Sequence, residues 1–473
     1  MSTDADILKK EEETDSFRDH LATMDDRGRR KWIFAQKPKG KFYNIRTWIS
    51  WFFFALFFTI PFIHINGRPL FLFNVTEAKF IIFGQVFWPQ DFFIFGITMI
   101  TFIIFIVLFT AAFGRLFCGW VCPQTIFMEM FFRKIEYFIE GNASEQRLLA
   151  KAPWTGKKIF KKVTKHLVFY LASFIIANLF LSYIIGLKEL ERIITEPLSE
   201  HVGGFFSIII FSGVFYAVYA YFREQACTVV CPYGRLQGVL LDKNSMIVAY
   251  DYKRGEPRGK VKKQEADHLG DCIDCFQCVK VCPTGIDIRN GTQMECVGCT
   301  ACIDACDSIM EKVNRPKGLI RYASENGIAQ REKLKFTPRM KLYTVLLGAL
   351  ISLLVFLLST RKDVDATVMR TPGMLYQQRG TDSISNLYNI KVANKTVHKI
   401  PLSVKLEGTP GTVQVIGSQQ YINVQDEGQG SGSFFIILPR EVIRNRKTLL
   451  KLGLYEGDKK IDVVKTSFLG PVN

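Results

Sequence analysis

The sequence lacks the motifs of several large enzyme classes. It contains no phosphate-binding loop, no dinucleotide-binding glycine motif and no hydrolase triad. Acidic residues are also few, with 44 Asp and Glu against 61 Lys and Arg and a formal net charge of +17. Such an excess of positive charge is typical of proteins that bind nucleic acid or anionic lipid, and of the cytoplasmic loops of membrane proteins. We favour the membrane, and expect no nucleic-acid partner, because the basic residues lie beside long apolar runs.

Cysteine is missing from most of the chain. None occurs before Cys118 or after Cys306, and all 12 belong to CxxC or CxxxC spacings within that interval. A secreted disulfide scaffold scatters its cysteines through small loop-rich domains, so this clustering instead predicts metal ligation by thiolates. The charged residues 1–26 contain no short apolar segment with a cleavage site, and we expect no signal peptide.

Long apolar runs are abundant, with 48% hydrophobic residues and 41 Phe. Five runs are long enough, or nearly so, to cross about 30 Å of hydrocarbon. They are Thr47–Ile65, Phe92–Phe113, Leu167–Leu187, Gly204–Phe222 and Leu342–Ser359. The apolar patch Leu70–Trp88 is interrupted by polar residues, and we interpret it as a hairpin or surface segment between the first two runs.

The distribution of basic residues predicts the orientation of these spans. Lys and Arg number eight in residues 27–46, two in 66–91, ten in 114–165 and two in 188–203. Because strongly basic loops stay in the cytoplasm, we expect the N-terminus, residues 114–165 and the basic region 223–341 on that side. An odd number of spans then places residues 361–473 outside, which is the periplasm for a bacterial inner membrane.

These patterns predict an integral membrane α-helical protein with about five transmembrane helices, a cytoplasmic ferredoxin-like domain with two [4Fe–4S] clusters and a C-terminal all-β Ig-like sandwich. The expected domains are a basic cytoplasmic tail (1–46), a membrane domain with four transmembrane helices (47–240), the ferredoxin-like domain (241–341), a fifth transmembrane helix (342–360) and a periplasmic β domain (361–473). Short alternating segments predict the sandwich. They are Tyr388–Val392, Ile400–Leu406, Thr412–Ile416, Ser433–Leu438, Leu449–Tyr455 and Ile461–Phe468.

Two consecutive cysteine runs give the strongest signal. Residues 272–283 read CxxCxxCxxxCP, the spacing that binds [4Fe–4S] in bacterial ferredoxins, and residues 296–306 repeat it without the final proline. The fourth cysteine of each run ligates the other cluster. We therefore assign Cys272, Cys275, Cys278 and Cys306 to cluster 1, and Cys296, Cys299, Cys302 and Cys282 to cluster 2. Zinc is the alternative, but zinc ribbons use paired CxxC knuckles instead of two such runs.

Two further cysteine pairs lie at the cytoplasmic ends of spans. Cys118 and Cys122 follow the second span and Cys227 and Cys231 follow the fourth, each pair in a CxxxCP motif. In a helix, positions i and i+4 share a face, so each pair could present two thiolates in one direction. We predict that the four thiols form a metal or redox site, since soft thiolates favour Cu(I), zinc or iron. Reversible disulfides or simple packing of small residues are the alternatives.

Other candidates are weaker. His64 and His201 lie at the outer ends of spans and suggest a haem, but interfacial histidines are common without one. Met128 and Met130 lie two positions apart, which puts them on different helix faces, so we expect packing instead of ligation.

The order of these features resembles the cytochrome c oxidase accessory protein family, CcoG/FixG/RdxA. The resemblance rests on FCGWVCP (117–123), ACTVVCPYGRLQ (226–237), the AYDYKRGEPRG loop (249–259), the double ferredoxin run and the outer β domain. It implies a role in assembling cbb3-type cytochrome oxidase, by reducing Cu(II) to Cu(I). The implied partners are copper ions, oxidase subunits or assembly factors, and an electron donor that the family does not specify.

Two other functions remain open from the residues. A quinol-linked electron relay of the membrane polyferredoxin type would use the same membrane half. A non-redox assembly scaffold would use the β domain and keep the clusters for structure alone.

Overall fold

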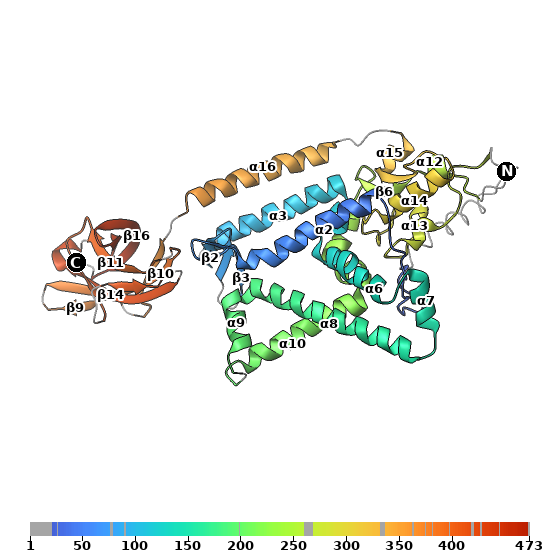
Figure 1. The fold of residues 1–473 in the computed structure, drawn as a ribbon. Coiled ribbons are helices and arrows are strands. Elements are labelled where there is room, and N and C mark those ends of the chain that lie inside the picture. Colours follow the sequence, from blue (N-terminus) through green and yellow to red (C-terminus); the bar gives the residue numbers. More distant parts are fainter. Residues whose placement is uncertain are drawn as a thin grey trace. The chain divides into compact units, whose positions relative to one another are not determined.

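The computed structural model describes residues 21–471 except 26, 76–78, 89–90, 198, 260–267, 332–335, 362–363, 374, 381, 397, 418–420, 426–427 and 444. The first twenty residues of the predicted tail therefore lie outside the described residues. The chain forms two compact units, one of residues 1–62 with 99–351 and one of residues 63–98 with 352–473. Figure 1 labels their elements.

Within the described residues, five helices are long and apolar enough to cross a membrane, in agreement with the predicted number. They are α2 (Lys41–Thr59) with a short turn to Phe62, α3 (Phe92–Phe113), α8 (Gly156–Ile185), α10 (Val202–Ala217) with a π-helical end at Val218–Phe222, and α16 (Pro338–Ser359). Helix α8 begins eleven residues before the predicted Leu167. Its first turns carry several lysines, which are good helix formers, so the helix continues beyond the apolar stretch.

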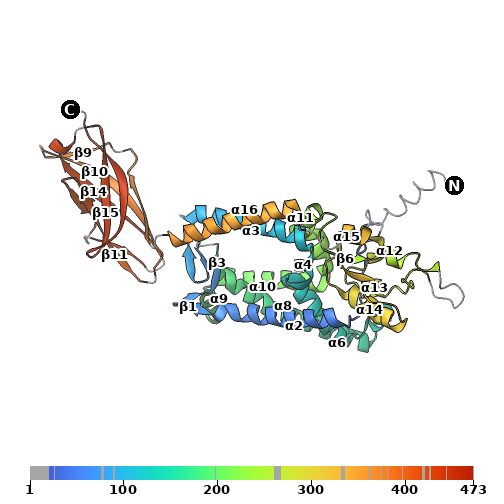
Figure 2. The same cartoon turned by 90° about the horizontal axis from the view of Figure 1, so that it is seen from above.

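Aromatic packing holds the membrane part of the first unit together. Helices α8 and α10 lie side by side in both views (Figures 1 and 2). The buried Phe132 ring stacks on Tyr219 at 4.4 Å between centroids and meets Phe169 edge-on at 5.0 Å. Phe132 belongs to a π-helical segment, Ile126–Phe132, that follows the first CxxxCP motif. The first CxxxCP motif is therefore anchored to the helix bundle by the π-helical segment that follows it.

Short elements surround the ferredoxin-like runs. Strands β6 (Ile247–Tyr250) and β7 (Ile320–Ala323) pair antiparallel, and helices α13 (Gln277–Lys280) and α14 (Ala301–Lys312) carry cysteines. Further short helices of the first unit are α4 (Leu116–Trp120), α5 (Pro123–Thr125), α6 (Arg133–Ile139), α7 (Ala143–Lys151), α9 (Leu187–Thr195), α11 (Pro232–Leu240), α12 (Tyr252–Gly255) and α15 (Glu325–Ala329).

The second unit contains the predicted sandwich. One sheet has the order β12-β14-β10-β8 with β9 beside β10, and the other has the order β13-β11-β15-β16. The strands are β8 (Val364–Arg370), β9 (Gln377–Arg379), β10 (Ser383–Asn394), β11 (Ile400–Glu407), β12 (Thr412–Val415), β13 (Ile422–Val424), β14 (Gln429–Pro439), β15 (Lys447–Glu456) and β16 (Lys459–Leu469). All six predicted segments are strands, while β8, β9 and β13 were not predicted. Tyr388 and Phe434 stack at 5.7 Å in the core.

Residues 63–98 belong to this second unit and contain more than a hairpin. They form β1 (His64–Ile65), β2 (Arg68–Pro69) and a three-stranded meander of β3 (Phe71–Asn74), β4 (Lys79–Ile82) and β5 (Gln85–Phe87). The buried Lys395 ammonium contacts Asp91 at 2.7 Å and Asp365 at 2.5 Å, and Arg361 also contacts Asp91, at 2.6 Å. These buried ion pairs tie the meander region to the sandwich.

Candidate metal centres

The two ferredoxin-like runs fold in the same way. In each run, one residue before the second cysteine and the residue after it adopt left-handed backbone angles: Asp274 and Phe276 in the first run, Gly298 and Thr300 in the second. Phe276 and Thr300 then stand at the N-termini of α13 and α14. Left-handed residues turn the chain sharply, so each loop wraps its three cysteines around one point.

Each run faces its own cavity. One cavity is lined by Cys272, Cys275, Cys278 and Cys306, together with Tyr250, Arg289 and apolar side chains. The other is lined by Cys282, Cys296, Cys299 and Cys302, with Cys278 also at its wall. These are the two sets of four assigned from spacing, including the exchange of the fourth cysteine. Four thiols around an apolar cavity are the donor set that [4Fe–4S] takes, so the residues present fit the group.

The missing proline after Cys306 changes the local backbone. In the first run α13 ends at Lys280, before the Cys282-Pro283 step, whereas α14 continues through Cys306 to Lys312. Asp307, which replaces the proline, accepts a hydrogen bond from the Gly318 amide at 2.8 Å. The aspartate therefore fixes the following turn, and Cys306 still lines the first cavity.

Burial controls the protonation of these thiols. It raises the pKa of Cys278 and Cys306 to about 12 and that of Cys299 to about 11, in each case reinforced by neighbouring cysteines or an acidic residue. The thiols are therefore protonated at neutral pH when no metal is bound. Because the thiolate is the ligand, metal binding at these sites must release protons.

The backbone of the two CxxxCP motifs differs from the continuous helix that their spacing suggested. Cys122 and Cys231 are extended, with ψ of 122° and 115°, and each precedes a proline at the first position of a new helix. A residue before proline is pushed out of the helical region, which explains the break. Cys118 lies in α4 and Cys227 in a π-helical turn, Ala226–Val230. The two thiols of a pair thus come from two short elements.

The two motifs interlock. The Cys118 thiol donates a hydrogen bond to Gln237 Oε1 at 3.3 Å, and Gln237 lies on α11, after the second motif. Cys227 Sγ lies 4.0 Å from the Thr125 hydroxyl, which follows the first motif. Each first cysteine is therefore held by the opposite motif, and the structure brings the four thiols of the paired-thiol site (Cys118, Cys122, Cys227 and Cys231) together.

Burial also governs the paired-thiol site. It raises the pKa of Cys118 to about 11 and of Cys227 to about 12, and the other cysteines of the site add to both shifts. The nearby Arg115 acts in the opposite direction on Cys118. Arg235, the other basic residue beside the motifs, is exposed.

The paired-thiol site lies against the second ferredoxin-like run. Gly119, next to Cys118, packs on the backbone of the second run so closely that an added Cβ would lie 2.6 Å from Gly298 C and 2.9 Å from Val297 O. Two arginines bridge the same boundary. Arg46 donates to Gly119 O at 2.6 Å and Cys299 O at 3.3 Å, and Arg115 donates to Cys296 O at 3.1 Å.

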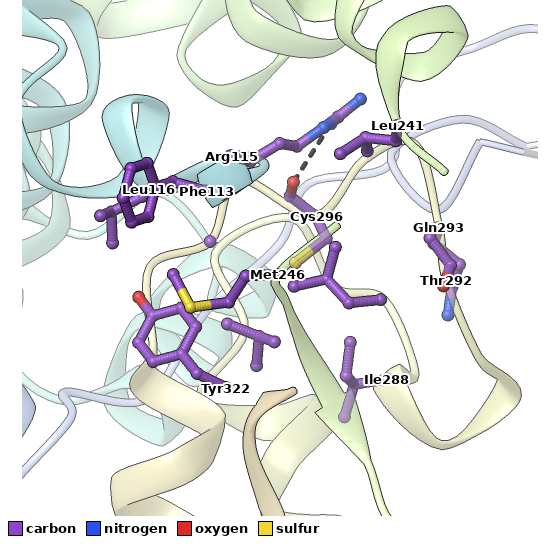
Figure 3. A pocket seen from close by; sticks show the side chains of 13 residues that line it. Phe113, Arg115, Leu116, Leu241, Met246, Ile288, Thr292, Gln293, Cys296 and Tyr322 are labelled. Atoms are coloured by element: carbon purple, nitrogen blue, oxygen red, sulfur yellow. Dashed lines mark hydrogen bonds between the residues drawn. The ribbon is translucent and has the colours of Figure 1, made fainter. Parts of the chain in front are cut away.

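An apolar pocket opens beside this boundary. Figure 3 shows its walls, with the Arg115 guanidinium hydrogen-bonded to the Cys296 carbonyl. Its other residues come from the end of α3 and the start of α4, from β6 and the segment before it, from β7, and from residues 288–298. They are Phe113, Leu116, Leu241, Met246, Ile247, Val248, Ile288, Thr292, Gln293, Gly298 and Tyr322. Neither this pocket nor the contacts of Arg46 were predicted from the sequence. In the sequence, Arg46 is one of the eight basic residues that precede the first apolar span.

The remaining candidates have other partners. Met128 and Met130 are buried in the hydrophobic core, as expected. His201 hydrogen-bonds Glu196, and with Glu200 these residues form the one group, among the described residues, of three or more Cys, His, Asp or Glu ligand atoms within 4.8 Å of one another. Among the cysteine thiols, all of which belong to the described residues, no three lie within that distance of one another.

Comparison with known proteins adds independent information. A family described as "4Fe-4S dicluster domain" matches residues 222–325, one described as "4Fe-4S binding domain" matches 95–141, and one described as "IG-like fold at C-terminal of FixG" matches 354–471. The nitrogen fixation protein FixG of Rhizobium meliloti is 30% identical over 83% of this chain and 82% of its own. The proteins RdxA and RdxB of Cereibacter sphaeroides are 32% and 30% identical, over 80% and 83% of this chain and 83% and 87% of theirs. These matches show an iron–sulfur protein of the multi-pass membrane type.

Proposed function

The chain belongs to the FixG/RdxA family, and we propose that it reduces Cu(II) to Cu(I) for the assembly of a cbb3-type cytochrome oxidase. The observation that carries the proposal is the direct packing of the paired-thiol site on the second ferredoxin-like run, through Gly119 and Gly298. If both sites are loaded as proposed, a one-electron acceptor with soft ligands would lie beside a one-electron donor.

In this proposal the eight ferredoxin-like cysteines hold two [4Fe–4S] clusters, which supply one-electron transfer when bound. Cys118, Cys122, Cys227 and Cys231 bind the copper substrate. Thiolates prefer Cu(I) over Cu(II), so the site stabilises the product of reduction. Gln237 and Thr125 contact the two first cysteines, and the partial burial of the four thiols limits the access of water to the bound ion.

The membrane arrangement is part of the proposal. The basic segments support a cytoplasmic N-terminus and ferredoxin-like domain, with residues 361–473 in the periplasm. An oxidase subunit or an assembly factor would dock there, while a cytoplasmic reductant supplies the electrons. The domain boundaries that we predicted from the sequence follow this topology.

The proposal is tested by mixing the anaerobically reduced protein with Cu(II) and a colorimetric Cu(I) chelator. For the wild type, we expect one Cu(I) to form for each electron stored in the reduced protein. A Cys118→Ser, Cys227→Ser double variant that retains its full iron content should form Cu(I) much more slowly. The Arg235→Gln variant is the control, because it changes an exposed side chain near the second motif without removing a thiol ligand. Equal rates for the double variant and the wild type would refute a role of these thiols.

The apolar pocket beside Cys296 favours a second candidate function, a quinol-linked electron relay. Its lining by Phe113, Leu116 and Leu241 at the end of a span suits a membrane-soluble ring. Oxidation of a quinol analogue releases two electrons and two protons, and should reduce the protein stoichiometrically. The variant Leu116→Trp, which fills the pocket, should abolish this reduction while dithionite still reduces the protein. A wild-type protein that is inert to quinols would exclude the relay.

A further inference from the structure

Arg46 is a buried cation whose position is fixed from several sides. It is 3% exposed and lies one turn into α2. The N-terminus of that helix is held by Asp304 of α14, whose carboxylate accepts hydrogen bonds from the Phe42 and Tyr43 amides at 3.1 and 2.7 Å. The helix that carries Arg46 is thereby attached to the helix that carries Cys302 and Cys306.

The guanidinium has no acidic partner in the described part of the chain. Its two hydrogen bonds go to the neutral carbonyls of Gly119 and Cys299, no carboxylate lies within 4.0 Å, and its Nη2 has no hydrogen-bond partner. The nearby acids have other partners: Glu129 pairs with Arg133 at 3.1 Å, and the Asp304 carboxylate accepts hydrogen bonds from the α2 amides. Buried charges are normally paired, because an isolated charge loses its hydration without compensation.

The first cavity shows the contrasting arrangement. Its buried arginine, Arg289, pairs with Asp274 at 2.5 Å and with Asp287 at 2.6 Å. Its positive charge is therefore balanced by protein carboxylates. Arg46, beside the second cavity, has no such carboxylate partner in the described part of the chain, so the two cavities differ in charge balance although their cysteine loops are alike.

A cluster held by four thiolates is itself an anion, and its negative charge increases when it accepts an electron. We propose that Arg46 sets the reduction potential of the iron–sulfur group held by Cys282, Cys296, Cys299 and Cys302. The guanidinium supplies that group's counter-charge, and so stabilises the reduced form more than the oxidised form. This inference deepens the proposed function, because the same guanidinium also contacts Gly119, next to Cys118.

The contact with Gly119 makes Arg46 a positioning residue for the paired-thiol site as well. Its two donors hold the peptide of Gly119 and the peptide of Cys299 at a fixed separation. A charge that binds at Cys118 is therefore sensed by the second cavity more strongly than by the first. Such coupling is reciprocal, so the redox state of the second cavity also changes the affinity of the thiols for a cation.

The test is a redox titration of the full-length protein in nanodiscs, followed by EPR and without copper. Arg46→Gln should lower the reduction equilibrium constant of one cluster about tenfold, which corresponds to about 59 mV for one electron, and leave the other unchanged. The cluster whose potential shifts should be the one whose EPR signal is altered by Cys302→Ser, because Cys302 belongs to the second set of cysteines. Arg46→Lys, which keeps the charge, should lie closer to the wild type. Arg235→Gln, the removal of an exposed charge, should shift neither signal.

Two results would overturn the inference: unchanged potentials in an iron-replete Arg46→Gln protein, or an equal shift in Arg235→Gln. If Arg46→Gln does not retain iron, Arg46→Met decides, because it fills similar space without a charge. The titration contains no copper, so its outcome is independent of the proposed function. A wild type that fails to reduce Cu(II) would refute that function and leave this test standing.

Discussion

Replacing Gly119 with alanine tests the close contact between the paired-thiol site and the second ferredoxin-like run. The added Cβ would lie 2.6 Å from Gly298 C and 2.9 Å from Val297 O, and these are backbone atoms that cannot rotate away. Ordinary contact begins near 3.4 Å. The two backbones must therefore separate by at least about 0.8 Å, because the Gly298 oxygen lies closer still to the added Cβ than Gly298 C does. Because Gly298 lies between Cys296 and Cys299, the movement displaces two predicted ligands.

The magnitude follows from two opposing effects. Overpacking a tight site costs about 1–3 kcal/mol, and contact with backbone on two sides places Gly119 near the upper limit. Alanine in a helix offsets about 0.5–1 kcal/mol of this cost. We therefore expect a net destabilisation of about 2 kcal/mol, together with a longer hydrogen bond between Arg46 and the residue 119 carbonyl.

The assay is the temperature at which the iron–sulfur absorbance is lost under anaerobic heating. Gly119→Ala should lose it at a lower temperature than the wild type. The matched control is Gly213→Ala in α10, where an added Cβ meets nothing within 4 Å; this variant should equal or exceed the wild type. If Gly119→Ala retained its iron as well as the control does, the tight contact would be refuted.

Two further predictions concern buried charge. Glu136 is buried on α6 and, despite the opposing effect of burial, the Arg223 guanidinium is the main cause that lowers its pKa to about 2. Glu136→Gln removes the 2.7 Å partner of Arg223 and leaves it only the weaker ion pair with Glu224 at 3.9 Å. The variant should destabilise the first unit by about 3 kcal/mol in thermal unfolding; a loss below about 1 kcal/mol would show that the pair with Glu136 matters little. In the second unit, the pKa of Asp91 is lowered, against the effect of burial, by hydrogen bonds from Lys395 and Arg361. The stabilisation that ionised Asp91 contributes is complete above the ordinary carboxyl pKa near 4 and is lost as the pH falls through the lower pKa of the folded protein. Acid should therefore increase the opening of the meander region, measured by hydrogen exchange, in the wild type and not in Asp91→Asn. An identical pH response in both proteins would contradict this role of Asp91.

The parts of the fold that depend on local composition could be predicted from the sequence. The five apolar helices and six of the sandwich strands follow from runs and alternation that are visible within ten to twenty residues. Strands β9 and β13 have only three residues each, too few to show a period. The early start of α8 was missed because its lysines prevent an apolar pattern without preventing a helix.

Contacts between distant segments could not be predicted. Nothing near Asp91 in the sequence indicates its ion pair with Lys395, 304 positions away. At the metal sites, spacing alone indicated the sets of cysteines that line each cavity. Arg46 gave no such signal, because an arginine at the edge of an apolar span has the same appearance whether it meets lipid headgroups or a buried carbonyl.

The backbone of the CxxxCP motifs shows how a correct spacing can suggest an incorrect conformation. Two cysteines four residues apart would share one face of a helix, but the proline after the second cysteine forces that cysteine out of the helical conformation. The proline was visible in the sequence, and its effect on the preceding residue was the signal that we did not use.

The central claim is that electrons stored in the ferredoxin-like domain reduce copper. It is tested most directly by EPR of the dithionite-reduced protein, freed of excess reductant, before and after one equivalent of Cu(II) is added. The account predicts reduced-cluster signals that disappear together with the Cu(II) signal, because the product Cu(I) has no unpaired electron. Cluster signals that persist beside an unchanged Cu(II) signal would contradict it.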